Sequence, residues 1–112
     1  MPRGYELQRV ALRPGARESE RIRAAVPRGM RMIVLDERGR DLTTIAFAPL
    51  LSRETAFIIG GADGLEAGIK KDAAMLLRIS SFTLPHALAQ VVLLEQLYRA
   101  ATLLTGHPYH RE

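Results

Sequence analysis

The final third of the chain constrains the fold most, because it couples an apolar run to one long uninterrupted helix. The run spans Met75–Ile79 and enters a polar turn. Pro85 then opens a helix that continues to Thr105 without Gly or Pro, and Gly106 supplies the stop signal. The tail beyond it cannot extend the helix because Pro108 lacks an N–H, and we expect this tail to pack against the protein.

The long helix is apolar around most of its circumference. Its apolar residues are Leu88, Val91, Val92, Leu94, Leu97, Ala101 and Leu104. Its polar residues Gln96, Arg99 and Thr102 form one narrow stripe. An arc this wide requires burial on two sides. In a domain this small the second side is expected to meet another subunit, so the pattern predicts a homodimer.

Arg99 has two interpretations. Glu95 lies four residues before it, in the favourable order for a helical ion pair. Alternatively, Arg99 directs its charge at a phosphate or an anionic base from the edge of a dimer groove.

The preceding chain alternates strands and helices. The predicted strands are Tyr5–Leu12, Met30–Leu35, Thr55–Ile59 and Ala74–Ile79. The predicted helices are Glu18–Val26, a middle helix that starts at a cap at Asp41 or Thr43, and Leu65–Asp72. Pro49 should shorten or kink the middle helix. The alternation predicts an α/β fold with a mainly parallel sheet and flanking helices, in a single domain over residues 1–112.

The expected ligand site lies beyond the carboxyl ends of the strands, as in other parallel sheets. The loops at Asp36–Gly39, Gly60–Gly64 and Ser80–Thr83 should converge there. The glycines of the middle loop permit close approach to a ligand, but they do not form the dinucleotide fingerprint G-x-G-x-x-G. Such a turn is more often structural than cofactor-binding.

The histidines do not favour a metal site. His107 and His110 have no evident third ligand in the sequence. His86 follows directly after Pro85 and is interpreted as a first-turn residue with a structural hydrogen bond.

Length and composition exclude several classes of protein. The chain has 112 residues, no cysteine, and no apolar run long enough to span a membrane. No apolar segment follows Arg3 as in a secretory signal, so the cytoplasm is the expected compartment.

The net charge of +4 is unevenly distributed. Ten of the sixteen basic residues precede Asp41: Arg3, Arg9, Arg13, Arg17, Arg21, Arg23, Arg28, Arg31, Arg38 and Arg40. Clustered arginine is typical of a surface that faces RNA or DNA. The alternative is an ordinary solvated surface.

Several short motifs occur together in a characteristic order. They span Leu35–Gly39, Ile59–Leu65, Thr83–His86, Leu94–Ala100 and His107–Arg111. Over about residues 30–112 the chain closely resembles the ribosomal RNA large subunit methyltransferase H family, which belongs to the knotted SPOUT methyltransferases. Members of that family are homodimers that transfer a methyl group from S-adenosylmethionine to N3 of a pseudouridine in 23S rRNA of the ribosome.

The resemblance implies a deep C-terminal trefoil knot and a set of site residues. The implied cofactor-binding residues are Leu35, Gly61, Ser80, Ser81, Phe82, Thr83, Leu84 and Pro85. Arg99, Tyr109 and His110 are the implied catalytic residues, and Arg99 and Arg111 would face the RNA across the dimer interface.

The family carries a further strand and helix ahead of the segment that Tyr5–Leu12 resembles, and we expect this chain not to contain them. This departure keeps two alternatives open. One is a catalytically inactive knotted homodimer that retains the fold and the cofactor pocket. The other is a plain RNA-binding module, whose RNA binding would be strongly salt-dependent and independent of cofactor.

Overall fold

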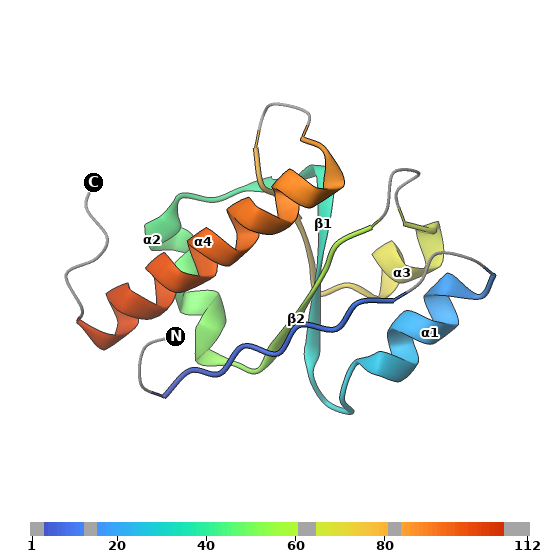
Figure 1. The fold of residues 1–112 in the computed structure, drawn as a ribbon, viewed down its shortest axis with the longest axis horizontal. Helices are drawn as coiled ribbons and strands as arrows, with labels where there is room; N and C mark the ends of the chain where they lie inside the picture. Colours follow the sequence, from blue (N-terminus) through green and yellow to red (C-terminus); the bar gives the residue numbers. More distant parts are fainter. Residues whose placement is uncertain (1–3, 13–15, 61–64, 81–83, 107–112) are drawn as a thin grey trace.

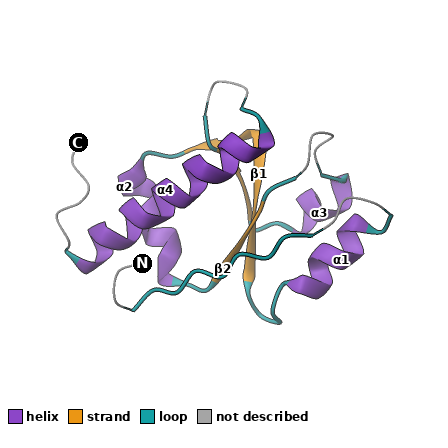
Figure 2. Cartoon of the chain, viewed as in Figure 1, coloured by secondary structure: helices purple, strands orange, loops and turns teal. Residues whose placement is uncertain are grey.

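The computed structural model describes residues 4–12, 16–60, 65–80 and 84–106. Its elements are helix α1 (Glu18–Ala25), strand β1 (Arg31–Asp41), helix α2 (Thr44–Phe47), the 3₁₀ helix η1 (Ala48–Ser52), strand β2 (Thr55–Ile58), helix α3 (Ala67–Asp72), strand β3 (Met75–Arg78) and helix α4 (His86–Thr105). Helices flank the strands on both sides (Figure 2).

The described strands form one parallel sheet in the order β2-β1-β3. The predicted α/β fold with a parallel sheet is therefore confirmed. Ile33 of β1 lies opposite Phe57 of β2 and Met75 of β3. Because β1 lies between its two partners, it forms the centre of the domain.

The two faces of the sheet have separate cores. Successive side chains of a strand point to opposite faces. Ile33 accordingly packs in the cluster that α2, η1 and α4 cover, whereas Val34 packs with Ile22 of α1 and Ile69 of α3. Figure 1 shows α2 and α4 on one side of the strands and α1 and α3 on the other.

Strand β1 contains a protrusion at the predicted turn. Leu35 and Arg40 both lie opposite Leu77 of β3, so residues 36–39 bulge out between two paired segments. The strand resumes after the turn, which the sequence did not predict. A Cβ atom at Gly39 would lie 2.6 Å from the backbone carbonyl carbon of Leu76, so this close approach requires glycine.

The predicted cap at Thr43 and the break at Pro49 are confirmed. The Thr43 hydroxyl accepts a hydrogen bond from the Ala46 N–H at 3.1 Å. Helix α2 ends at Phe47, and Pro49 lies in the first turn of η1, where its missing N–H costs little. Asp41, the alternative cap, instead pairs with Arg78.

The predicted strand at Tyr5–Leu12 is wrong. Residues 5–12 carry no strand assignment, and Leu7, Val10 and Leu12 are 47%, 57% and 42% exposed. Among the described residues, β1 pairs with β2 and β3, and the segment at residues 5–12 does not pair with the sheet. A strand needs a hydrogen-bonding neighbour as well as apolar residues, and no described strand pairs with this segment.

Helix α4 begins one residue later than predicted, with Pro85 as its N-cap residue and His86 as its first residue. Gly106 ends it with a φ of 75°, in the left-handed region that glycine tolerates, as predicted. The predicted hydroxyl at Thr83 and the tail from residue 107 lie outside the described residues.

Candidate functional site

The carboxyl edge of the sheet gathers part of the expected site. Leu35 ends the first paired segment of β1, Gly60 follows β2 closely and Ser80 follows β3 closely. All three are half-buried. Because the strands are parallel, these positions lie at the same edge.

Of the remaining cofactor-binding candidates, the structure describes only two. Leu84 is half-buried and Pro85 is exposed at the start of α4. Gly61, Ser81, Phe82 and Thr83 lie outside the described residues.

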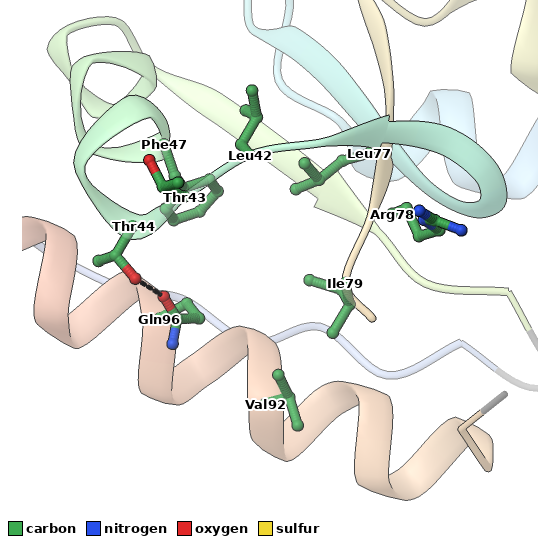
Figure 3. Close-up of a pocket in the computed structure, with 9 residues that line it drawn as sticks. All are labelled: Leu42, Thr43, Thr44, Phe47, Leu77, Arg78, Ile79, Val92 and Gln96. Atoms are coloured by element: carbon green, nitrogen blue, oxygen red, sulfur yellow. Dashed lines mark hydrogen bonds between the residues drawn. The ribbon is translucent and has the colours of Figure 1, made fainter. Parts of the chain in front are cut away.

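A cavity of about 250 Å³ opens between the end of β3 and α4. It is lined by Leu42, Thr43, Thr44, Phe47, Leu77, Arg78, Ile79, Val92 and Gln96. Figure 3 shows Ile79 and Val92 on its walls and the Thr44 hydroxyl bonded to the Gln96 side-chain oxygen at one end. Pockets for drug-sized ligands measure roughly 300–1,000 Å³, so this cavity suits part of a ligand.

The sequence alone does not indicate that the polar residues of this cavity lie together. The sequence predicts Thr43 as a helix cap and Gln96 as part of the polar stripe on α4, but their proximity in the cavity arises from tertiary packing. Gln96 was the residue that could have indicated this contact, because the amide of a largely apolar helix needs a hydrogen-bond partner where it is buried. Thr44 is that partner.

Arg78 and Asp41 form an ion pair beside the cavity. The hydrogen bond and charge of Arg78 lower the pKa of Asp41, and Asp41 in turn raises the pKa of Arg78. Both groups are therefore charged at neutral pH, and the positive charge of Arg78 is balanced locally.

Asp36 is the most enclosed carboxylate described at the carboxyl edge, with a side chain that is 8% exposed. Its Oδ1 accepts the Arg38 backbone N–H at 2.9 Å, and its Oδ2 lies 2.9 Å from Lys70 Nζ. The backbone hydrogen bond from Arg38 and the contact with Lys70 lower its pKa. Asp36 is thus held as a carboxylate.

On α4, Arg99 pairs with Glu95 through the predicted four-residue spacing. The side chains are 31% and 36% exposed. The helical ion pair is therefore present, and the role of Arg99 toward RNA stays a prediction. Tyr109, His110 and Arg111 lie outside the described residues.

Part of the N-terminal arginine cluster has structural partners. Arg31 donates to the Leu50 carbonyl at 2.6 Å and contacts the Thr55 hydroxyl. Arg23 pairs with Asp72 at 2.7 Å. These arginines fasten elements of the fold to one another, so the charge cluster is a weaker signal for nucleic acid than its number of residues implies.

A larger groove of about 1,410 Å³ runs between the N-terminal segment, β2, α1 and α4. The exposed side chains of Leu7, Val10 and Leu12 lie along it. The sequence does not predict this groove, because the apolar residues of the N-terminal segment indicate a strand.

Within the described part of the chain, no helix is long and apolar enough to cross a membrane. The same residues contain no cluster of three or more His, Cys, Asp or Glu that could hold a metal ion.

Comparison with known proteins identifies the family. A family profile described as "Predicted SPOUT methyltransferase" matches residues 6–110, which includes the sheet, its carboxyl edge and α4. The chain belongs to the SPOUT methyltransferase family. The resemblance noted from its motifs is thereby confirmed.

Several proteins similar to this SPOUT chain bear the name ribosomal RNA large subunit methyltransferase H. One from Janthinobacterium sp. (strain Marseille) is 56% identical over 102 residues, which cover 86% of this chain and 65% of the relative. One from Polynucleobacter asymbioticus is 53% identical over 103 residues, covering 87% and 70%. One from Ralstonia pickettii is 54% identical over 100 residues, covering 84% and 64%. The chain thus spans about two-thirds of the length of these relatives.

Proposed function

We propose that this protein is an S-adenosylmethionine-dependent methyltransferase that modifies N3 of a pseudouridine in 23S rRNA, in the cytoplasm. The observation that carries the proposal is the family match across residues 6–110, together with relatives named for large-subunit rRNA methylation. The carboxyl edge, where Leu35, Gly60 and Ser80 gather, supports it because ligands bind there in parallel sheets.

The described residues fit such a cofactor. Backbone groups at the strand ends suit adenine and the amino-acid moiety, and the neighbouring cavity offers the hydroxyls of Thr43 and Thr44 beside apolar walls. We assign the pocket to Leu35, Gly61 and Ser80–Pro85. When bound, S-adenosylmethionine supplies an activated methyl group.

The tasks of the protein are to position the base and to manage one proton. N3 of pseudouridine carries a hydrogen that must leave before or during methylation. We assign Arg99 and Arg111 to stabilise the developing negative charge of the base and to contact RNA, and Tyr109 or His110 to accept the proton. Most of the rate gain is assigned to orientation of N3 toward the methyl group.

We also propose a homodimer with the trefoil knot of the family. The dimer is supported by Leu88 and Val91 of α4 and Ile45 of α2, which are 47%, 59% and 49% exposed although they are large and apolar. A second subunit would cover them.

Single-turnover methylation of ribosomes tests the catalytic assignment. Tyr109→Phe and His110→Ala are expected to slow the chemical step by roughly 10²–10⁴-fold if the residue replaced is the proton acceptor. Full rates in both variants would eliminate that role. Cofactor binding with no methyl transfer in the wild-type protein would favour the inactive homodimer instead.

A further inference from the structure

The Asp36 carboxylate joins two elements at the carboxyl edge of the sheet. It follows directly after Leu35 and begins the protrusion of residues 36–39. One oxygen accepts the Arg38 N–H inside this protrusion, and the other contacts Lys70 of α3. Both oxygens thus have partners, and these partners come from different parts of the fold.

The contact with Lys70 fixes how α3 lies against the protrusion. Ile69, the preceding residue of α3, is fully buried with Val34 on the sheet face. Packing of Ile69 holds the helix against the sheet, but apolar contact is not directional. The Lys70–Asp36 contact adds a fixed point at the position next to Leu35.

A second ion pair on the same helix provides a contrast. Arg23 of α1 contacts Asp72 of α3 at 2.7 Å, but both side chains are about half exposed, at 44% and 48%. Asp36 is 8% exposed. Removing the partner of an enclosed carboxylate costs more stability than removing the partner of an exposed one, because little water can reach the enclosed charge to solvate it. The Arg23–Asp72 pair joins α1 to α3, and neither residue belongs to the protrusion of residues 36–39.

We propose that Asp36 and Lys70 are positioning residues, which hold Leu35 and residues 36–39 in the conformation that binds the cofactor. This inference rests on the proposed function, because it assigns the cofactor to the carboxyl edge. Neither side chain is assigned a contact with the reacting atoms. Their effect is transmitted through the backbone of Leu35 and of the protrusion, whose return to β3 at Arg40 depends on the close approach of Gly39. A binding site works only if its residues stay within about 0.5 Å of the geometry that binds the ligand. A small shift of the backbone at Leu35 is therefore expected to weaken cofactor binding.

The experiment measures S-adenosylmethionine affinity by calorimetry and the melting temperature of each variant. The test variants are Asp36→Asn, Lys70→Met and Lys70→Arg, and the matched controls are Asp72→Asn and Arg23→Met. We expect Asp36→Asn and Lys70→Met each to weaken binding by about 10- to 100-fold. Lys70→Arg should restore most of the affinity, and the controls should stay within about twofold of wild type.

A double variant separates positioning from general destabilisation. If the two residues act as one unit, Asp36→Asn with Lys70→Met should bind about as weakly as either single variant. The proposal would be overturned if the loss of affinity in the double variant equalled the product of the two single losses. It would also be overturned if affinity fell in proportion to the melting temperature in test and control variants alike. Wild-type affinity in folded Lys70→Met would overturn it as well, and this arm remains if Asp36→Asn does not fold.

Failure of the proposed function is distinguishable in the same experiment. If wild-type protein does not bind S-adenosylmethionine, the cofactor assignment itself is wrong and the positioning role falls with it. If the wild-type protein binds S-adenosylmethionine and the test variants bind it with the same affinity, the cofactor assignment stands and the positioning role alone is wrong.

Discussion

Ile33 and Val34 are adjacent on β1, and both side chains are fully buried on opposite faces of the sheet. One strand therefore supplies the centre of both cores. Replacement of Ile33 by Ala should lower the free energy of unfolding by about 2–5 kcal/mol, because it removes contacts and leaves a cavity. Urea denaturation measures this change. Val10→Ala, at a side chain that is 57% exposed, is the control and should change stability by less than about 0.5 kcal/mol.

Gly39→Ala should destabilise the protein. The added Cβ would lie 2.6–2.7 Å from backbone atoms of Leu76 and Leu77, which cannot move without disturbing β3. We expect a loss of about 1–3 kcal/mol or more in thermal unfolding. Gly68→Ala in α3 is the matched control, since its Cβ would meet one side-chain nitrogen of Arg23 at 3.4 Å. Helix propensity should make that control neutral or up to about 1 kcal/mol more stable.

Thr43→Ala should destabilise the start of α2 by about 1 kcal/mol, because the Ala46 N–H loses its acceptor. Thr43→Ser keeps the hydroxyl and should retain most of the stability. Chemical denaturation of the two variants checks this expectation. Equal losses in both would indicate that the methyl group, rather than the cap, matters.

The stability contribution of Asp36 should depend on pH in a defined direction. Its pKa is lowered in the folded protein by the Arg38 N–H and by Lys70. Such a group stabilises the fold above its unfolded pKa of about 3.9, and this stabilisation is lost as pH falls through the lower folded value. The stability difference between wild type and Asp36→Asn should therefore be constant from about pH 5 to 7 and shrink below about pH 4.

Thermal unfolding at a series of pH values measures this difference. A gap between the two proteins that stays constant into strong acid would contradict the assignment, because it would mean that the carboxylate charge contributes nothing.

Val91→Glu should weaken self-association if α4 forms the dimer interface. Val91 is 59% exposed, and a glutamate there would place an unpaired charge inside the interface. We expect sedimentation equilibrium to show the dissociation constant raised at least about tenfold. Val10→Glu, at a similar exposure of 57%, should leave it unchanged. A monomeric wild-type protein would contradict the proposed dimer.

Local signals were sufficient for much of the fold. The β-branched run around Ile33 predicted a buried strand, and Thr43 and Gly106 predicted helix ends that the structure confirms. The order of strands and helices predicted the parallel sheet. These features depend on residues that are close together in the sequence, so they can be predicted from the sequence alone.

Features that depend on distant partners were missed. Tyr5–Leu12 has the apolar residues of a strand but no ladder in the described sheet. The resumption of β1 at Arg40 depends on pairing with Leu77, and the enclosure of Asp36 depends on Lys70. The strand order predicted that Leu35 and Ser80 lie at the carboxyl edge of the sheet, as they do. The cavity beside Gln96 arises from helix packing that periodicity does not specify.

Transfer of labelled methyl from S-adenosylmethionine to ribosomes that lack N3-methylated pseudouridine tests the proposed activity most directly. After nuclease digestion, mass spectrometry of the 23S rRNA locates the methyl group. We expect about one methyl group per ribosome, on N3 of a pseudouridine, with no incorporation when the protein is omitted. Absence of incorporation under conditions where one of the relatives named ribosomal RNA large subunit methyltransferase H methylates the same ribosomes, or a methyl group on another atom, would contradict the proposed function.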